Sequence, residues 1–198
     1  MKPALIIVDL LRDTFEQHPA SRIVQSARAF IPRLNMLIDC FHREKLPVVF
    51  ACDSFLPEDP IFTAGVRPHS LRGTSGADVI PELQRLSEDH IVPKRRFSSF
   101  FKTDLDQTLR ILGVDTVLVT GIATHVCVLS TALDAVSHDF QAVIVEDCCA
   151  AHNPQIHASV LAGYREPPIA PLVLVHDSQQ CIKWVEESRR QAMSCLPR

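Results

Sequence analysis

The sequence lacks any apolar run long enough to cross a membrane, and it contains no CxxC pair. Its opening segment, MKPALIIVDL, reaches Asp9 after only a short apolar stretch, which is typical of neither a signal peptide nor a membrane span. The seven cysteines are an odd number, so a disulfide framework or a zinc ribbon is not expected. We therefore expect a cytoplasmic protein with reduced thiols and no membrane partner.

A basic stripe is also missing. Lysine and arginine number 20 against 23 acidic residues, which gives a formal net charge of −3, and the basic residues are scattered. Because a nucleic-acid surface needs clustered positive charge, we expect no nucleic-acid partner. There is no internal repeat, and 198 residues suffice for one well-packed domain but are few for two. We expect a single domain over residues 1–198.

Several short apolar runs predict strands that are buried on both faces. They are rich in valine and isoleucine and do not alternate with polar residues, as parallel sheets require. Amphipathic helical patterns lie between most of them, and strand alternating with helix predicts a doubly wound parallel α/β sheet. The strands are expected at 4–9, 47–53, 90–94, 116–121, 142–147 and 171–177, and the main helices at 20–45, interrupted at Pro32, at 103–113 and from 178.

Two segments do not follow this alternation of strand and helix. The segment 54–78 contains prolines and glycines and has no clear period, and a long ordered loop in a compact domain is commonly functional. The segment 165–171, REPPIAP, predicts a rigid connection into the last strand.

Chemically capable side chains follow the predicted strands. Asp9, Asp53, Lys94 and Asp147 end the first, second, third and fifth strands, and Cys127 follows the fourth at the start of a helix. In open α/β sheets, ligands bind beyond the carboxyl ends of the strands. A carboxylate, an ammonium group and a thiol are therefore expected to meet at one edge of the sheet.

These three groups suit nucleophilic catalysis. A helix N-terminus and the Lys94 ammonium would stabilise a thiolate, Asp9 would take the thiol proton and pass it to a departing amine, and backbone N–H groups of the 121–127 turn would hold an oxyanion. A structural interpretation stands beside this one. Buried cysteines are usually small apolar side chains, an aspartate at a strand end often caps a helix, and a lysine there is often a solvated charge. Spacing alone leaves both open, although packing is expected for the thiols of Cys40, Cys52, Cys148, Cys149 and Cys181.

Four segments resemble the isochorismatase-like cysteine hydrolase superfamily, near nicotinamidases and N-carbamoylsarcosine amidases. They occur in the expected order over nearly the whole chain. The resemblance implies a three-layer α/β/α sandwich, Rossmann-like, around a mainly parallel six-stranded sheet. The segments are ALIIVDLLRDTF, KRRFSSFFKTDL with its S-x-F-x-x-T-x-L pattern, VTGIATHVCVLSTALDA with G-[VI]-x-T-x-x-C-V, and AVIVEDCCAA.

The resemblance also implies roles for residues of the site. Cys127 would be the nucleophile, Asp9 the general base and Lys94 its electrostatic partner. A cis peptide bond would fall between Ile122 and Ala123 and turn the Ala123 N–H toward the oxyanion, beside the N–H of Cys127. The reaction would pass through a thioester, with loss of ammonia or another amine, and would use no redox or nucleotide cofactor. Members of this superfamily usually form dimers or tetramers, so a homo-oligomer is expected.

The chain departs from the metal site of nicotinamidases. These enzymes carry D-x-H and further histidines after the second strand, whereas this chain has Phe55 at the place of the first histidine. Asp53 and His69 still match, and Glu58 or Asp59 would have to complete the set. Two ligands are too few for a stable zinc or iron site, so we expect no metal.

The chain also departs from the opening D-x-Q-x-D-F pattern. Leu11 replaces the glutamine, Thr14 holds the aromatic position, and Phe15 follows one residue later. In the family this aromatic often stacks on a substrate ring, so its displacement argues against a nicotinamide-like substrate. The residues expected to line the substrate pocket are Phe55, His69, Phe97 and Thr124.

Three functions follow from this sequence. The first is a cysteine amidohydrolase that cleaves the C–N bond of a small amide, ureido or carbamoyl compound. The second is an isochorismatase-type vinyl-ether hydrolase, against which Cys127 counts because such enzymes lack the nucleophilic cysteine. Its dicarboxylate substrate would favour a cationic pocket, for which Arg12, Arg72, Arg95 and Arg96 are available. The third is a non-catalytic member that binds a metabolite.

Overall fold

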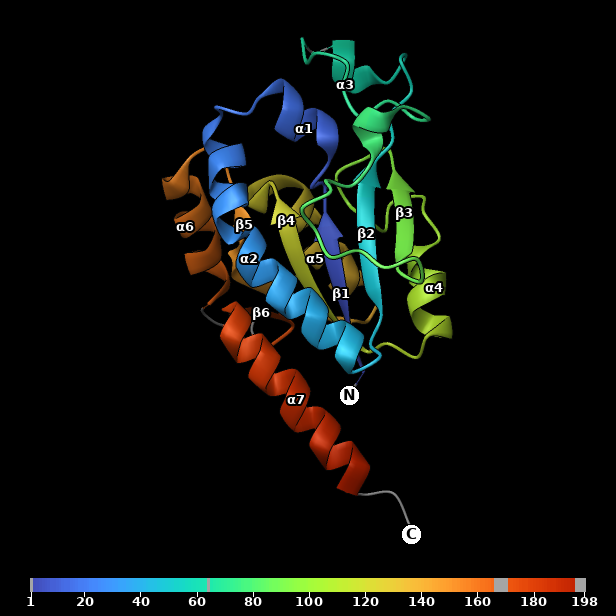
Figure 1. The fold of residues 1–198 in the computed structure, drawn as a ribbon, viewed down its shortest axis with the longest axis vertical. Helices are drawn as coiled ribbons and strands as arrows, with labels where there is room; N and C mark the ends of the chain where they lie inside the picture. The colour runs from blue at the N-terminus through green and yellow to red at the C-terminus, as the bar shows by residue number, and fades with distance from the viewer. Residues whose placement is uncertain (1, 64, 166–170, 195–198) are drawn as a thin grey trace.

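The computed structural model describes residues 2–63, 65–165 and 171–194 (Figure 1). Cys195 and the interior of the expected rigid connection, 166–170, lie outside the described residues. Within the described part, the six predicted strands form one all-parallel sheet with the order β3-β2-β1-β4-β5-β6, so the predicted α/β fold class is confirmed. The strands are β1 (Pro3–Val8), β2 (Val48–Asp53), β3 (His90–Lys94), β4 (Thr116–Ile122), β5 (Gln141–Ala150) and β6 (Val173–His176).

Helices cover both faces of the sheet and make three layers (Figure 1). Alternate residues of β1 show the division, because Leu5 and Ile7 belong to one hydrophobic core and Ile6 and Val8 to the other. Helices α2 (Arg22–Arg43) and α7 (Ser178–Ser194) pack on the first face, and α4 (Leu105–Ile111), α5 (Leu129–Ser137) and α6 (Pro154–Tyr164) on the second. Two short helices, α1 (Arg12–Gln17) and α3 (Pro60–Thr63), lie beyond the carboxyl ends of β1 and β2 (Figure 1).

Two expectations about these elements are wrong. Helix α2 continues through Pro32, because its apolar stripe, which includes Ile31 and Leu34, is buried against the sheet. That burial outweighs the backbone hydrogen bond lost at the proline, a loss of roughly 3 kcal/mol. Strand β3 alternates between buried and exposed residues, since it is an edge strand.

No helix among the described residues is both long enough and apolar enough to span a bilayer.

The order of the strands reverses between β1 and β4, and ligands of open α/β sheets bind at such a switch point. The two backbones approach closely there. Gly121 pairs with Val8 and has a φ of +105°, and a β-carbon on it would overlap the Val8 carbonyl oxygen. Glycine is therefore required on both conformational and steric grounds. Asp9 directly follows β1 at this point, and Cys127 lies in the turn that follows β4.

Candidate active site

A cavity of about 570 Å³ opens at the switch point. One wall comes from the strand ends and the turn after β4, and the other from α1, the start of α2 and the loop 65–78, with His152 from the segment after β5. The strand-end wall contains Asp9, Asp53, Ile122, Ala123 and Cys127, and the outer wall contains Asp13, Thr14, Gln17, His18, Ser21, Ile23, Val66, Arg67 and His69.

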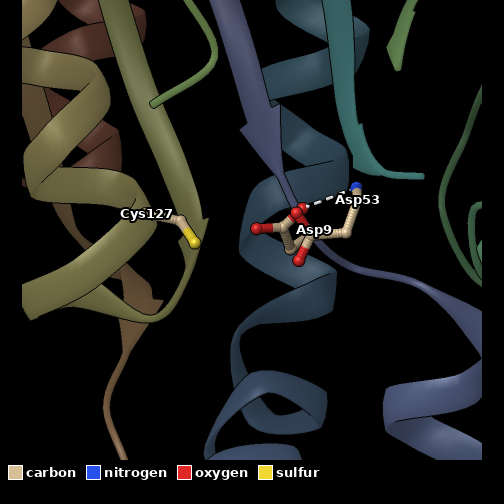
Figure 2. A group of neighbouring side chains, drawn as sticks. All are labelled: Asp9, Asp53 and Cys127. Atoms are coloured by element: carbon tan, nitrogen blue, oxygen red, sulfur yellow. Dashed lines mark hydrogen bonds between the residues drawn. The ribbon is translucent and has the colours of Figure 1, made fainter. Parts of the chain in front are cut away.

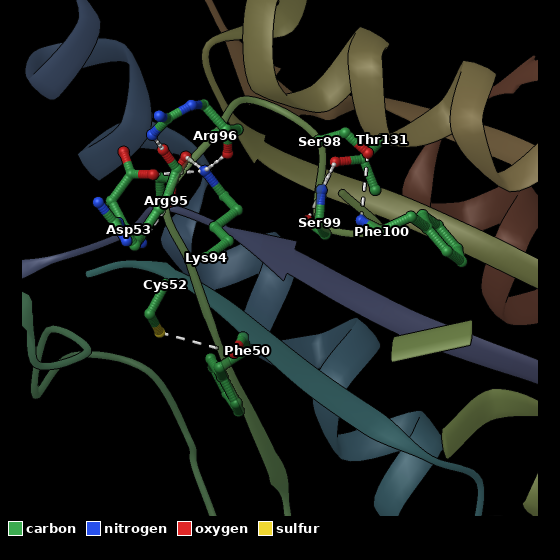
Figure 3. A network of polar contacts seen from close by, with 11 residues as sticks. Phe50, Cys52, Asp53, Lys94, Arg95, Arg96, Ser98, Ser99, Phe100 and Thr131 are labelled. Carbon is green, nitrogen blue, oxygen red and sulfur yellow. Dashed lines mark hydrogen bonds and ion pairs between the residues drawn. The ribbon is translucent and has the colours of Figure 1, made fainter. Parts of the chain in front are cut away.

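Lys94 lies behind the strand-end wall and joins two carboxylates. Its side chain is 0% exposed, and its Nζ lies 2.8 Å from Oδ2 of Asp9 and 2.6 Å from Oδ1 of Asp53. The ammonium group also donates to the carbonyl oxygen of Arg96 at 3.2 Å (Figure 3). The parallel register that pairs Asp53 with Lys94 places these two residues side by side.

Asp9 is fixed from two directions. Its φ is +56°, in the left-handed region that aspartate tolerates better than most residues. Its other oxygen, Oδ1, accepts the backbone N–H of Asp53 at 3.0 Å (Figure 2). The Asp9 carboxylate is therefore held by a cation on one oxygen and by an amide on the other.

Cys127 faces this carboxylate from the far side of the switch point (Figure 2). One carboxylate oxygen each of Asp9 and Asp53 and the Sγ of Cys127 all lie within 4.8 Å of one another. Cys127 is 9% exposed and sits in a single π-turn, Thr124–Val128, that leads into α5. The Ile122–Ala123 peptide bond before this turn is cis, and both residues line the cavity. The structure thus brings together Asp9, Lys94 and Cys127, which are far apart in the sequence.

The segment that follows Lys94 is tied to the helix that follows Cys127. The N–H of Ser99 donates to the hydroxyl oxygen of Thr131 in α5 at 3.0 Å, and the two hydroxyl groups are also hydrogen-bonded (Figure 3). This buried link fixes the segment after β3 relative to the helix that follows the Cys127 turn.

Electrostatics at the cluster differ from the sequence expectation. Burial, followed by the Asp9 carboxylate, raises the pKa of Cys127, and the Lys94 ammonium only partly opposes this rise. The direction of this shift is opposite to the one expected from the sequence, which was a stabilised thiolate. One ammonium cannot neutralise two carboxylates, so burial and Asp9 raise the pKa of Asp53 to about 7. Burial alone would lower the pKa of Lys94, but Asp9 and Asp53 raise it above its usual value.

A metal ion has few ligands here. Among the described residues, the one group of three with ligating atoms close together is Asp9, Asp53 and Cys127. Both carboxylates already contact the Lys94 ammonium, whose charge repels a divalent cation. Asp59, a ligand considered from the sequence, is buried against Arg95 and Arg96, whose hydrogen bonds lower its pKa. The residues present do not fit a metal centre.

The four predicted pocket residues lie in different places. His69 lines the cavity, with its ring 5.4 Å from that of Phe55. Phe55 is buried behind it and also packs against Phe62. Phe97 is 52% exposed, and the buried hydroxyl of Thr124 is hydrogen-bonded to His157 at 2.8 Å. Phe55, Phe97 and Thr124 are therefore not in the cavity lining, although Phe55 packs against the lining residue His69.

Further site residues escaped the sequence analysis. Thr14 lines the cavity at the position of the family aromatic, whereas Phe15 is in the core. The remaining cavity residues on α1 follow Asp9 within one or two helical turns. This closeness to Asp9 in the sequence could have been used to predict them. Asp147 is wrong as a candidate, because β5 runs past it and its carboxylate binds the N–H and hydroxyl of Ser178 at the start of α7.

The arginines considered for a cationic pocket also lie elsewhere. Arg12 borders a separate cavity, Arg72 donates to the hydroxyl of Ser54, and Arg95 and Arg96 pair with Asp59. None of these four lines the cavity at Cys127. These four arginines therefore do not form the cationic pocket that a dicarboxylate substrate would favour, and the one arginine among the described lining residues is Arg67.

Comparison with known proteins shows the family to which this chain belongs. A family model described as the Isochorismatase domain matches residues 3–177. The chain belongs to this family. Its resemblance to isochorismatase-like hydrolases, first seen in the sequence segments, is thereby confirmed.

Relatives in this family are named as amidases. The structure of N-carbamoylsarcosine amidase from Thermoplasma acidophilum is 32% identical, with a TM-score of 0.77, over 90% of this chain and 97% of that one. The nicotinamidase PncA from Bacillus subtilis is 27% identical, with a TM-score of 0.74, over 89% of this chain and 100% of that one. The ureidoacrylate amidohydrolase RutB from Serratia proteamaculans is 39% identical over 84 residues, which are 42% of this chain and 34% of that protein.

Proposed function

We propose that this protein is a cysteine amidohydrolase that cleaves the C–N bond of a small amide, ureido or carbamoyl compound. The observation that carries the proposal is the Cys127 thiol at the cavity wall, within 4.8 Å of the carboxylates of Asp9 and Asp53. A thiol beside a base that is itself oriented by a third group is the arrangement of nucleophilic catalysis. The amidases among its relatives support the same class of reaction.

In the first half of the reaction, Sγ of Cys127 attacks the carbonyl carbon and its proton passes to Asp9. Because burial and the Asp9 carboxylate raise the pKa of the thiol, we propose that the proton leaves as the sulfur attacks. The carbonyl oxygen becomes an oxyanion, for which the N–H groups of Ala123 and Cys127 are the donors. The C–N bond then breaks, the nitrogen takes the proton from Asp9, and an acyl thioester remains on Cys127.

In the second half, water attacks the thioester and gives its proton to Asp9. The C–S bond breaks, the acid product forms, and the proton returns to the sulfur. Lys94 keeps its charge throughout, because its pKa is raised, and it holds the Asp9 carboxylate in place. We propose that no metal takes part and that the working protein is a homo-oligomer.

A screen for ammonia release tests this function. Nicotinamide, N-carbamoyl amino acids, ureido acids and simple primary amides are incubated with the wild type, with Cys127→Ala and with the control Cys181→Ala, which removes a buried thiol outside the cavity. We expect turnover of at least one compound, abolished in Cys127→Ala and retained in the control. Turnover that survives in Cys127→Ala refutes the assignment. A vinyl ether is tested in parallel by product analysis, and its hydrolysis without ammonia release from any of the other compounds replaces the assignment with the second function.

A further inference from the structure

Asp13 connects the two components of the outer cavity wall. It lies on α1 and lines the cavity, and its Oδ2 accepts the backbone N–H of Ser70 at 2.6 Å. Ser70 is buried and has a φ of +47°. Its carbonyl oxygen accepts the N–H of Phe55 at 3.0 Å, on the segment that follows β2. Ser70 therefore links α1 to the end of the second strand, and Asp13 supplies the acceptor on the α1 side.

Gly76 makes room for the same carboxylate. It lies in a short 3-10 turn, Ser75–Ala77, that packs against α1. A β-carbon on Gly76 would overlap all three terminal atoms of the Asp13 side chain. Its φ is not in the left-handed region, so the glycine is required for space and not for its conformation. The loop 65–78 thus contacts the Asp13 carboxylate at two separate points.

Backbone hydrogen bonds complete the attachment at the far end of the loop. The N–H of Arg12 donates to the carbonyl of Asp78 at 2.9 Å, and the N–H of Ile80 donates to the carbonyl of Leu10 at 3.1 Å. These bonds hold the end of the loop whatever side chain is at position 13. The Ser70 bond is different, because it depends on Asp13 and lies next to the two cavity residues Arg67 and His69.

We propose that Asp13 is a positioning residue that sets substrate selectivity by holding Arg67 and His69 at the cavity. It acts through the loop, and its hydrogen bond goes to the loop backbone, not to the Asp9, Lys94 and Cys127 cluster. The part of this inference that concerns substrate rests on the proposed amidohydrolase function. The part that concerns the loop does not.

Hydrogen exchange of the loop tests the attachment without any substrate. Asp13→Ala removes the acceptor, Asp13→Asn keeps an oxygen that accepts the Ser70 N–H, and Glu16→Ala changes an exposed residue of the same helix. We expect amide exchange over residues 66–76 to accelerate about tenfold in Asp13→Ala, because a local opening then costs one hydrogen bond less. Exchange in Asp13→Asn and Glu16→Ala should stay near the wild type. Unchanged exchange in Asp13→Ala overturns the proposal.

Kinetics on any amide that is turned over test the effect on selectivity. We expect Asp13→Ala to raise KM about tenfold for the best substrate, with kcat within about threefold, since one ordered contact is lost and the nucleophile is untouched. The KM of poor substrates should rise less, so the ratio of kcat/KM for the best substrate to kcat/KM for a poor one decreases in Asp13→Ala. Asp13→Asn should restore this ratio to the wild-type value. A fall in kcat with KM unchanged shows instead that Asp13 takes part in the chemistry and overturns a positioning role. Faster exchange with unchanged selectivity overturns it too.

If no amide is turned over, the proposed function fails but this inference does not. Selectivity is then measured by the rate at which alkylating reagents modify Cys127. The rate of Cys127 alkylation by iodoacetamide is divided by the rate with a bulkier maleimide, and this ratio should move toward one in Asp13→Ala. An unchanged ratio overturns the inference. Gly76→Ala, which displaces the Asp13 carboxylate, should reproduce the effect, whereas Gly163→Ala, where a β-carbon meets nothing within 4 Å, should not.

Discussion

The two walls of the cavity are built in different ways. In the strand-end wall, Asp9 follows β1 and Cys127 lies in the turn after β4, while Lys94 at the end of β3 is completely buried behind them. The outer wall consists of α1, the start of α2 and the loop 65–78, and the side chain of Asp13 accepts a hydrogen bond from the loop backbone at Ser70. Rigid sheet elements hold catalytic groups within a few tenths of an ångström, whereas loops tolerate change. From this difference we expect substitutions in the strand-end wall to change the rate of the proposed reaction and substitutions in the outer wall to change its selectivity.

The largest effect is expected from Asp9 in the strand-end wall. Asp9→Asn removes the group that takes the thiol proton, and loss of a general base costs typically 10²- to 10⁴-fold in kcat. We expect such a loss with KM changed much less, measured on the best substrate of the ammonia screen. Asp134→Asn on α5 is the control and should leave kcat unchanged. A change in KM as large as the change in kcat in Asp9→Asn would contradict the assignment of separate roles to the two walls.

Loss of the buried cation is expected to damage stability as well as activity. Lys94→Met leaves the carboxylates of Asp9 and Asp53 buried without their common partner. Removing one member of a buried ion pair costs roughly 3–5 kcal/mol. Urea denaturation should show a decrease of this size in the free energy of unfolding. Lys183→Met removes a lysine that is 77% exposed and should change the free energy of unfolding by less than about 1 kcal/mol.

The excess carboxylate predicts a particular dependence on pH. The pKa of Asp53 is raised from 3.8 to about 7, so between these values the folded protein keeps a proton that the unfolded chain has lost. The contribution of Asp53 to the free energy of unfolding therefore decreases as the pH rises from about 4 to about 7, and it is constant above this range.

Denaturation of Asp53→Asn across this pH range tests the assignment. The difference in stability between the variant and the wild type should move in favour of the variant as the pH rises to 7. Asp39→Asn, at an exposed position on α2, should give a difference that does not follow this trend. A variant that loses stability relative to the wild type over the same range contradicts the raised pKa.

The smallest effect is expected from a chelator. Because Lys94 occupies the space between the two carboxylates, we expect incubation with EDTA to leave kcat and KM unchanged. We compare the activity of samples with and without EDTA, and we then add zinc or manganese to the treated sample and measure its activity again. Loss of activity that returns with either metal would show that the strand-end wall holds a metal as well as a nucleophile.

Much of the strand-end wall was predictable from the sequence, because parallel strands are short apolar runs and their carboxyl ends carry polar residues. Asp9 follows such a run directly, Lys94 ends one, and Cys127 lies in the first turn after another. Asp147 also ends such a run, but β5 continues for three more residues, and a run of apolar letters does not show where a strand leaves the sheet. The direction of the Cys127 pKa was also not predictable, since it depends on two carboxylates whose distances only the fold determines.

The outer wall was much less predictable. The segment 54–78 has no period, so its side chains could not be assigned to a face. Phe55 was expected in the cavity and instead packs behind His69, and Asp13 was not considered although it lines the cavity. The contact of Asp13 with Ser70 spans 57 residues of chain and rests on a backbone N–H, which has no signature in the sequence.

The most direct measurement of the central claim is mass spectrometry of the protein quenched in acid during turnover. The account predicts an added mass equal to the acyl part of the substrate on the peptide that contains Cys127, absent in Asp9→Asn quenched at the same time. Turnover with no adduct on any cysteine at any quench time, or an adduct on a cysteine other than Cys127, would contradict it.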